Sequence, residues 1–522
     1  MQKTLAIKLF IIAGLCIVFT IGLNVFSSVI YERQNYADSV VREIAEQHVN
    51  PQEVISPFIA IPTTVTPECA ISAADKTVKC AAPYTKVKTV FATQTQATQN
   101  LTVSTDTYQR GIYHATSYNG DIKFDQNYLL QDQADEPSLN VSGQDLAVLI
   151  TTVPTSSASK VTPEQTITHW NEAKLIIPVS DLRGVATLPT VTINKQAINA
   201  TYPKTPMIRG LAYVEAVLPP QVLGQLQAQS LDIDTTAVTT KQSPKAKPSP
   251  PIGIVIDLPL SGISSLNTVP TGQNFELAMR SNWHAPNFIG KALPNAKNFS
   301  AAGFKANWQN QYLTIENNQY LSQCLNAPNN QCAVISRATL DTNSYDYADQ
   351  PVAVEAANGA TSSSVQLNSF GVSFAEPNDV YLQTERTMKY ALLLILVSFG
   401  TFFLFEIIKS SRIHPIQYLL VGCALLTFYV LLLPLAEQIA FWQAYAIAAS
   451  SCVGLIGWYT YYVLNGIKRA AIFTAILAGL YGAFYGILTT EDMNLLLGAV
   501  FCFALLACVM VMTRKIDWYK VA

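Results

Sequence analysis

Histidine, cysteine and acidic residues are the side chains in this sequence that could perform catalysis or hold a metal. No histidine stands in a spacing typical of a zinc site, and the sequence has no nucleophile elbow, P-loop or glycine-rich dinucleotide fingerprint. We therefore predict that the chain is not an enzyme and uses no cofactor or metal. An enzyme whose reactive groups cluster only in space is the alternative. The histidines are isolated in the sequence, at His48, His114, His169, His284 and His414.

The cysteines divide into a group inside apolar runs and two close pairs elsewhere. Cys69 lies near Cys80 and Cys324 near Cys332, and the turn-forming residues 325–331 can bring two strand ends together. Four cysteines allow three pairings, but local loops close most easily, so we predict two hairpin-closing disulfides in an oxidising compartment. Free thiols and a zinc site are the alternatives, and the lack of C-x-x-C spacing disfavours zinc. The remaining cysteines are interpreted as small apolar filler: Cys16, Cys423, Cys452, Cys502 and Cys508.

The composition indicates a membrane protein, because 50% of the residues are hydrophobic and only 13% are charged, against about 25% charged in soluble domains. Residues 9–31 carry no charge, and a helix of this length reaches about 35 Å, enough to cross a hydrocarbon core of about 30 Å. We predict an uncleaved anchor helix at about 9–30, within an N-terminal segment 1–31. A secretory signal peptide is the alternative, but Val25-Phe26-Ser27-Ser28 is a poor cleavage site.

Five further apolar runs follow in the C-terminal part, and each is long enough to span a membrane. Lysine and arginine gather in alternate connections, with Lys409 and Arg412 after the second span and Lys468 and Arg469 after the fourth. The positive-inside rule then places both termini in the cytoplasm, including the tail 514–522. The predicted five-helix bundle, 390–513, has spans at about 390–408, 416–435, 439–464, 470–488 and 495–513.

Residues 32–389 then form a large periplasmic domain whose local patterns are mostly those of strands. Hydrophobic residues alternate along 252–260, and 191–193 and 197–200 flank a short polar turn. We predict a β-rich domain of one or two lobes, with a Pro/Lys/Ser-rich loop or linker at 241–251.

The helical pattern in this domain is confined to its first stretch. Tyr36, Val40 and Ile44 recur at helical spacing and would prolong the anchor helix outward. The domain has a modest excess of acidic residues and no basic patch, so we expect no nucleic acid partner.

Ionisable groups inside a membrane span are functional candidates, and Glu406 lies clearly within a predicted span. Its position three residues before Lys409 favours an interfacial ion pair, with a proton carrier as the alternative. A transporter usually has several such groups near mid-membrane, so one shallow glutamate is thin support for transport.

Small residues recur every four positions on the fifth span, at Ala478, Gly482 and Gly486. This spacing lets another helix approach closely. We predict that the stripe packs inside the bundle, with homo-oligomerisation as the alternative.

Several stretches look familiar: 55–62, 181–185, 281–283 with Pro286, Phe288 and Gly290, Gly303-Phe304 with Trp308, 381–437, and 517–519. They resemble the CreD family of inner membrane proteins, in the expected order from the anchor to the C-terminus. The resemblance implies a non-enzymatic protein of the Gram-negative envelope that contributes to cell envelope integrity and is associated with a two-component regulatory system. It supplies no catalytic motif, and the four paired cysteines lie outside the matching stretches. Residues around 130–165 and 322–348 are extra material.

Four residues of the matching stretches are candidate functional residues: Arg183, Trp283, Arg412 and His414. We interpret 181–184 as a turn with a local ion pair, with an exposed contact site as the alternative. Trp283 is expected in core or interface packing. Arg412 and His414 are expected to set the topology and start a helix, and contact with a cytoplasmic partner is the alternative.

The sequence thus predicts an α-helical inner membrane protein with one N-terminal and five C-terminal transmembrane helices and a large β-rich periplasmic domain. Its expected role is binding or scaffolding in the periplasm, coupled to the membrane bundle. The expected partners are the lipid bilayer and either an envelope component or another inner membrane protein. The alternative is a small-solute transporter or channel that uses the C-terminal bundle.

Overall fold

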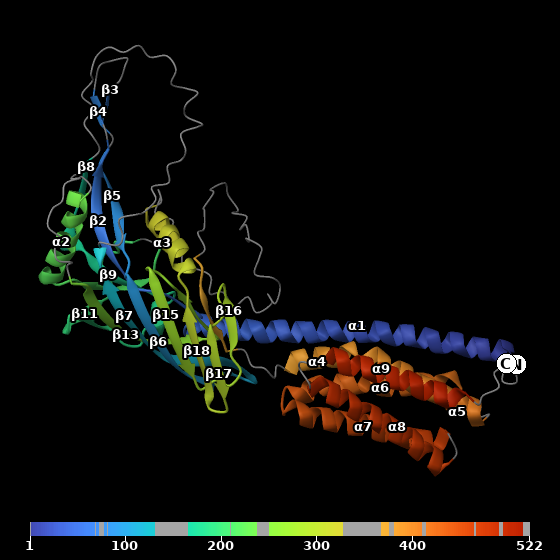
Figure 1. Cartoon of the computed structure of the whole chain (residues 1–522). Coiled ribbons are helices and arrows are strands. Elements are labelled where there is room, and N and C mark those ends of the chain that lie inside the picture. Colours follow the sequence, from blue (N-terminus) through green and yellow to red (C-terminus); the bar gives the residue numbers. More distant parts are fainter. Residues whose placement is uncertain are drawn as a thin grey trace. The chain divides into compact units, whose positions relative to one another are not determined.

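The described residues of the chain, shown as a computed structural model in Figure 1, form two compact units. The helical unit comprises Met1–Val40, Gly111–Tyr113 and Glu376–Ala522, and the β-rich unit comprises Val41–Arg110 and His114–Ala375. The structure describes residues 2–67, 69–71, 78–80, 82–130, 165–208, 210–236, 250–326, 367–374, 380–409, 414–463, 466–489 and 494–514.

A helix covers each predicted span in the helical unit. The ends shift only slightly in the C-terminal bundle, whereas the N-terminal helix extends beyond the predicted span 9–30 at both ends. By length and composition, three described helices could cross a membrane, in α1, α6 and α8, or four if the bent pair α4 and α5 is one span. Six spans therefore stay a prediction. The helices are α1 (Gln2–Gln47), α4 (Val380–Lys389), α5 (Ala391–Lys409), α6 (Pro415–Ala436), α7 (Phe441–Val463), α8 (Ile467–Thr489) and α9 (Asn494–Thr513).

The first helix belongs to the core of the helical unit. Phe19 of α1 is 2% exposed and packs edge-on against Phe399 of α5, with ring centroids 5.9 Å apart. Gly422 of α6 lies directly beneath the same ring, since a Cβ added there would be 2.1 Å from the Phe19 ring. The missing side chain of Gly422 therefore makes room for the aromatic ring of α1.

Strands dominate the β-rich unit, and its described strands form three sheets. The largest has the order β17-β18-β15-β6-β7-β13-β10-β11-β12-β9-β2-β5, with β8 paired to β2; a second has the order β1-β14-β19-β16, and β3 pairs with β4. The strands are β1 (Gln52–Ile55), β2 (Phe58–Thr66), β3 (Cys69–Ile71), β4 (Val78–Cys80), β5 (Tyr84–Val90), β6 (Gln94–Arg110), β7 (Tyr113–Tyr128), β8 (Gln165–Thr168), β9 (Lys174–Pro178), β10 (Thr190–Ile193), β11 (Gln196–Thr201), β12 (Tyr213–Val217), β13 (Ile252–Ile263), β14 (Ser265–Val269), β15 (Asn274–Ser281), β16 (Asn287–Gly290), β17 (Ala296–Ser300), β18 (Gly303–Gln309) and β19 (Phe370–Ser373).

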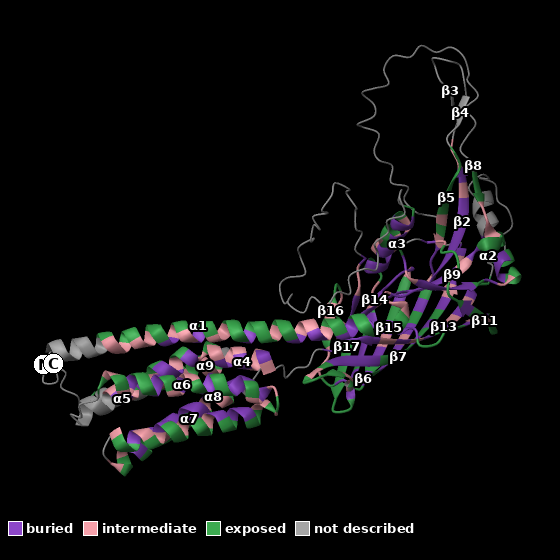
Figure 2. Cartoon of the chain, turned by 180° about the vertical axis from the view of Figure 1, so that it is seen from behind, coloured by how far each residue is buried: buried purple, intermediate pink, exposed green. Residues whose placement is uncertain are grey.

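Two local predictions for this unit are confirmed. Ile254 and Ile256 of β13 are fully buried and Asp257 is exposed, as the alternation requires, and the banding of buried and exposed residues along the strands is visible in Figure 2. β10 and β11 form an antiparallel hairpin whose turn residues, Asn194 and Lys195, have positive φ angles of 49° and 71°.

The expectation that only the first stretch of this domain is helical is wrong. α1 does continue to Gln47, with Val40 and Ile44 buried but Tyr36 56% exposed. Two more helices, α2 (Pro220–Thr236) and α3 (Tyr312–Leu325), lie within the β-rich unit. The buried residues of α3 include the polar Thr314 and Asn317. The apolar residues alone therefore do not show the helical periodicity of α3. Most of the loop at 241–251 and most of the extra material lie outside the described residues.

The two predicted cysteine pairs differ in their surroundings. Cys69 and Cys80 stand directly opposite each other in the antiparallel pair β3–β4, a register that suits a cross-strand bridge. Cys324 is buried near the end of α3, so the expectation that it ends a strand is wrong, and Cys332 lies outside the described residues. Both disulfides stay predictions.

The packing of α1 predicts the effect of a single methyl group. Gly422→Ala should lower the unfolding free energy of the full chain in detergent by about 1–3 kcal/mol, because the Phe19 ring must leave its position. Thermal unfolding in detergent measures this change. Gly454→Ala on α7 is the matched control, since a Cβ there meets nothing within 4 Å. Equal melting temperatures for the two variants would contradict the packing described for Phe19.

Candidate functional site

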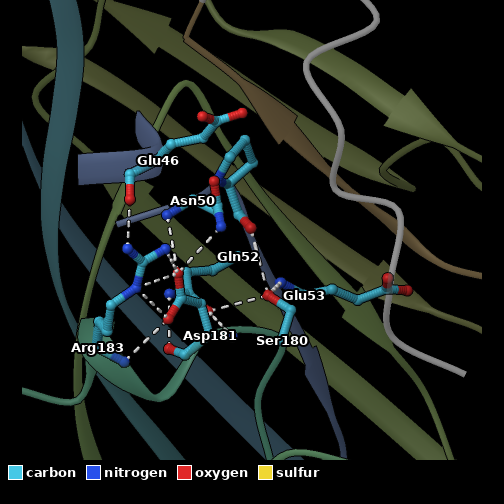
Figure 3. A network of polar contacts seen from close by, with 8 residues as sticks. Glu46, Asn50, Gln52, Glu53, Ser180, Asp181 and Arg183 are labelled. Atoms are coloured by element: carbon cyan, nitrogen blue, oxygen red, sulfur yellow. Dashed lines mark hydrogen bonds and ion pairs between the residues drawn. The ribbon is translucent and has the colours of Figure 1, made fainter. Parts of the chain in front are cut away.

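The polar residues around Asp181 form the most extensive charged network of the described β-rich unit, and Figure 3 shows it. Asp181 precedes the short 3-10 helix η3 (Leu182–Gly184) and caps it, accepting a hydrogen bond from the Arg183 backbone N–H at 3.0 Å. This local capping explains why an aspartate and an arginine two residues apart face each other here.

The Arg183 guanidinium joins Asp181 to the end of α1. Its Nε donates to both carboxylate oxygens of Asp181, at 3.0 and 3.1 Å, and Nη2 donates to Oδ2 at 2.6 Å. Nη1 donates to the backbone carbonyl of Glu46, at 2.5 Å, in the last turn of α1. The carbonyls at a helix C-terminus lack intrahelical donors and carry partial negative charge, so a cation there supplies both a donor and a favourable charge.

The chain that leaves α1 is fixed to the same aspartate. Asn50 donates to Asp181 Oδ2 through its backbone N–H, at 3.1 Å, and through its side-chain amide, at 3.2 Å. Gln52, which is fully buried, donates to the Asp181 carbonyl and accepts from the Asp181 backbone N–H. Ser180 accepts from the backbone N–H of Glu53 at 2.8 Å and returns a bond to its carbonyl through its own N–H at 2.9 Å.

We call Glu46, Asn50, Gln52, Ser180, Asp181 and Arg183 the helix-end clamp. Its members come from two segments about 130 residues apart in sequence, and they join the end of α1 and strand β1 to the turn that follows β9. Gly184 has room for no side chain, since a Cβ there would lie 2.3 Å from Gln52 Nε2 and 2.4 Å from the Ser261 carbonyl oxygen. The clamp therefore needs the bare backbone at Gly184.

Electrostatics keep the clamp ionised. Burial acts to raise the pKa of the Asp181 carboxyl, but hydrogen bonds from Arg183 and Asn50 and the charge of Arg183 together hold it below its ordinary value. The hydrogen bond and charge of Asp181 raise the pKa of Arg183 against its desolvation. A carboxylate that is held ionised and already accepts several donors is suited to fixing the backbone and poorly suited to moving protons.

Glu53 beside the clamp behaves differently. Burial raises the pKa of its carboxyl to about 7, although a hydrogen bond with Ser369 acts to lower it. The backbone of Glu53 is held by Ser180, and its strand β1 pairs in parallel with β14. A pKa of about 7 means that this carboxyl changes its charge near neutral pH.

The other predicted residues lie elsewhere. Trp283 is 8% exposed, packs against the Phe374 ring and donates from Nε1 to the Ala285 carbonyl at 2.9 Å, an arrangement typical of core packing. His414 caps α6: its Nδ1 lies 3.4 Å from the Ile416 N–H, which suits helix initiation. Arg412 and the side chain of Glu406 lie outside the described residues.

The small-residue stripe is not in the bundle interior. Ala478, Gly482 and Gly486 are all exposed on α8, so the prediction that they pack inside the bundle is wrong for the described residues. The inward face of α8 is built from larger side chains instead: Phe473, Leu477, Leu480, Tyr481 and Phe484.

No group of three or more His, Cys, Asp or Glu residues within the described ranges could hold a metal ion. Sequence reasoning identified Asp181 and Arg183 but missed Asn50, Gln52 and Ser180. The sequence around Asn50 and Gln52 offered little to identify them: it is a run of polar residues between a helical pattern and a strand, which usually marks only a loop.

Breaking the clamp should destabilise the β-rich unit. We expect Asp181→Asn to lower the unfolding free energy by about 1.5–3 kcal/mol at pH 7, because charge-assisted hydrogen bonds are lost. Since the folded-state pKa of Asp181 is lowered from its ordinary value of 3.8, its contribution is fully present above that value and disappears as the pH falls through the folded value. The two proteins should therefore keep their difference in the mildly acidic range and converge only below the folded-state pKa of Asp181.

The matched control for this experiment is Arg110→Gln. It breaks the exposed ion pair between Arg110 and Glu43, which should contribute less than about 1 kcal/mol. Chemical denaturation of the full chain in detergent measures both variants. Equal losses would show that the clamp is an ordinary surface ion pair.

The raised pKa of Glu53 predicts that its effect on stability depends on pH with the opposite sign to that of Asp181. A raised folded-state pKa favours folding below the ordinary value near 4.5, and this contribution is lost as the pH rises through about 7. Glu53→Gln cannot ionise, so its melting temperature should exceed that of the parent by about 2–4 °C at pH 8 and match it near pH 4. Glu276→Gln, an exposed glutamate on β15, should show no such pH-dependent gain. A constant difference across pH would exclude Glu53 as the titrating group.

Comparison with known proteins agrees with this architecture. The family described as inner membrane protein CreD matches residues 4–519. Inner membrane protein CreD of Escherichia coli (strain K12) is 28% identical over 508 residues, which cover 97% of this chain and 92% of that protein. No solved structure matches the chain significantly. Because the family match spans nearly the whole sequence, the chain belongs to the CreD family of inner membrane proteins.

Proposed function

We propose that the chain is a non-enzymatic inner membrane protein that supports cell envelope integrity. Its β-rich unit would bind or scaffold an envelope component in the periplasm, and its apolar helices would hold it in the membrane with both termini in the cytoplasm. The helix-end clamp is the observation that supports coupling between ligand binding by the β-rich unit and membrane anchoring by the helices. α1 runs unbroken from Gln2 to Gln47, and its last turn is bonded to Arg183 rather than followed by a free linker.

A clamp of this kind would transmit a displacement of the β domain to the anchor helix. A flexible linker would absorb such a displacement, whereas hydrogen bonds to Asp181 from both Asn50 and Arg183 resist it. The acidic and amide groups of the clamp are already hydrogen-bonded to one another, so they hold the backbone in place rather than act on a substrate. This division of roles favours a scaffold over an enzyme.

A transporter or channel is the second candidate, and the interior of the helical unit disfavours it. The described core between α5, α6, α7 and α8 is filled by aromatic rings, among them Phe428, Tyr445 and Tyr481. Tyr445 donates to the Tyr481 carbonyl at 2.8 Å, and the void beside these rings is about 10 Å³. A solute pathway through this part of the bundle would require the rings to move.

Complementation in a strain that lacks the gene tests the proposal. We expect the double variant Asp181→Asn/Arg183→Gln, which removes both charges, to insert and accumulate normally but to lose most of the resistance to envelope-damaging detergents. Arg110→Gln should restore resistance fully, as the matched control. Full resistance from the double variant, or from a chain that lacks the β-rich unit, would overturn coupling.

The same complementation assay distinguishes a scaffold from a transporter. Glu406→Gln should leave resistance unchanged under the scaffold proposal. Loss of function with normal accumulation would favour transport instead.

Thiol labelling in intact cells, with and without a periplasmic reductant, tests the orientation of the chain. The labelled residues are Cys69, Cys80, Cys324 and Cys332. Labelling only after reduction supports the periplasmic assignment and the two disulfides, whereas free thiols shielded from impermeant reagent would overturn that assignment.

A further inference from the structure

A hollow of about 400 Å³ lies on the solvent face of the large sheet, where strands β6, β15, β18 and β17 are neighbours. The strand register places four side chains in one row across it: Asn100 of β6, Arg280 of β15, Lys305 of β18 and Asn298 of β17. All four are exposed, and side chains paired across strands share a face of the sheet. The row therefore presents two cations between two amides.

The two cations are neighbours without a counter-charge. Arg280 and Lys305 are direct cross-strand partners, and like charges in that position destabilise a sheet. No carboxylate lines the hollow, and neither side chain has an ion-pair or hydrogen-bond partner among the described residues. Glu276, the acid on the same face of β15, instead accepts from Gln309. An anion between Arg280 and Lys305 would relieve their repulsion.

The floor of the hollow is fixed by its own backbone contacts. Gly303 has φ of 126°, and a Cβ there would lie 1.9 Å from the Ser281 carbonyl oxygen. Asn282 holds the neighbouring strand, accepting from the Val103 N–H at 2.7 Å and donating to the Val103 carbonyl at 3.0 Å. Since these groups hold one another, the shape of the hollow exists without a ligand, which favours binding.

We propose that this hollow binds a phosphate or carboxylate group carried on a hydroxyl-rich, glycan-like ligand. The planar fork of Arg280 suits either anion, and Lys305 adds a point charge. Asn100 and Asn298 have amide groups without hydrogen-bond partners among the described residues, and these could pair with ligand hydroxyls. The volume falls within the range of small-molecule sites, about 300–1,000 Å³, so there is room for more than an ion. The inference rests on the proposed function only for the source of the ligand.

Titration of the full chain in detergent tests the proposal, using inorganic phosphate, glucose 6-phosphate, glucuronate and glucose with saturation-transfer NMR or calorimetry. We expect the two charged sugars to bind, weakened by added salt, and glucose to show no binding. Stronger binding of glucose 6-phosphate assigns the hollow to phosphate, and stronger binding of glucuronate assigns it to carboxylate. Equal binding of inorganic phosphate and glucose 6-phosphate would overturn the glycan part, and binding of neither charged sugar would overturn the site.

Variants locate the binding. Arg280→Gln/Lys305→Gln should weaken the charged sugars at least tenfold without lowering the melting temperature, because the variant also removes a repulsion. Lys123→Gln, an exposed lysine on β7 whose cross-strand partner is Asp257, is the matched control and should bind as the parent does. Unchanged affinity in the double variant would overturn the assignment.

The complementation assay keeps the two proposals separate. Clamp variants that lose resistance but still bind glucose 6-phosphate or glucuronate would support both. A variant of Arg280 and Lys305 that loses binding yet restores full resistance would support the binding site and show that the site is not needed for envelope resistance.

Discussion

The pairing of one guanidinium with one helix end is the interaction on which the arrangement of this chain depends. Arg183 meets the Glu46 carbonyl in the last turn of α1, and Asp181 balances its charge. The two contacts support each other, because the partly buried carboxylate gains a counter-ion and the exposed arginine gains a fixed direction. Together they convert the end of a long helix into a fixed point from which strand β1 departs.

The fixed point also explains the buried amide beneath it. Gln52 has no exposed surface, yet both of its polar ends are satisfied, one by the Asp181 carbonyl and the other by Ser180 and the Asp181 backbone. A buried amide with complete hydrogen bonds defines one register and rejects others, because any slip leaves the group unpaired. The parallel pairing of β1 with β14 starts at this residue.

Sequence reasoning reached the parts of this structure that are encoded locally. The alternation through Ile254 and Ile256 and the turn at Asn194 arise from neighbouring residues, and the apolar runs predict helices whatever surrounds them. The partners of Asp181 could not be found in this way, since Asn50 and Gln52 are distant in sequence and meet it only through the fold. The helix α3 was missed because Thr314 and Asn317 occupy inward positions where the pattern expects apolar side chains. The small-residue spacing around Gly482 identified one face of α8, but spacing alone could not tell whether that face lies inside the bundle, and it is exposed.

The order of the large sheet has a consequence for self-association. In the described part of the chain this sheet ends in β17 on one side and β5 on the other, and an outer strand can recruit a second copy through unpaired backbone groups. On β5 the Asn326 side chain already occupies part of the backbone, because it accepts from the Val87 N–H and donates to the Val87 carbonyl. Each edge carries lysines, Lys297 on β17 and Lys86 and Lys88 on β5, and charged side chains on an outer strand oppose pairing with another outer strand. The lysines on both outer strands therefore disfavour growth of this sheet from one molecule into the next.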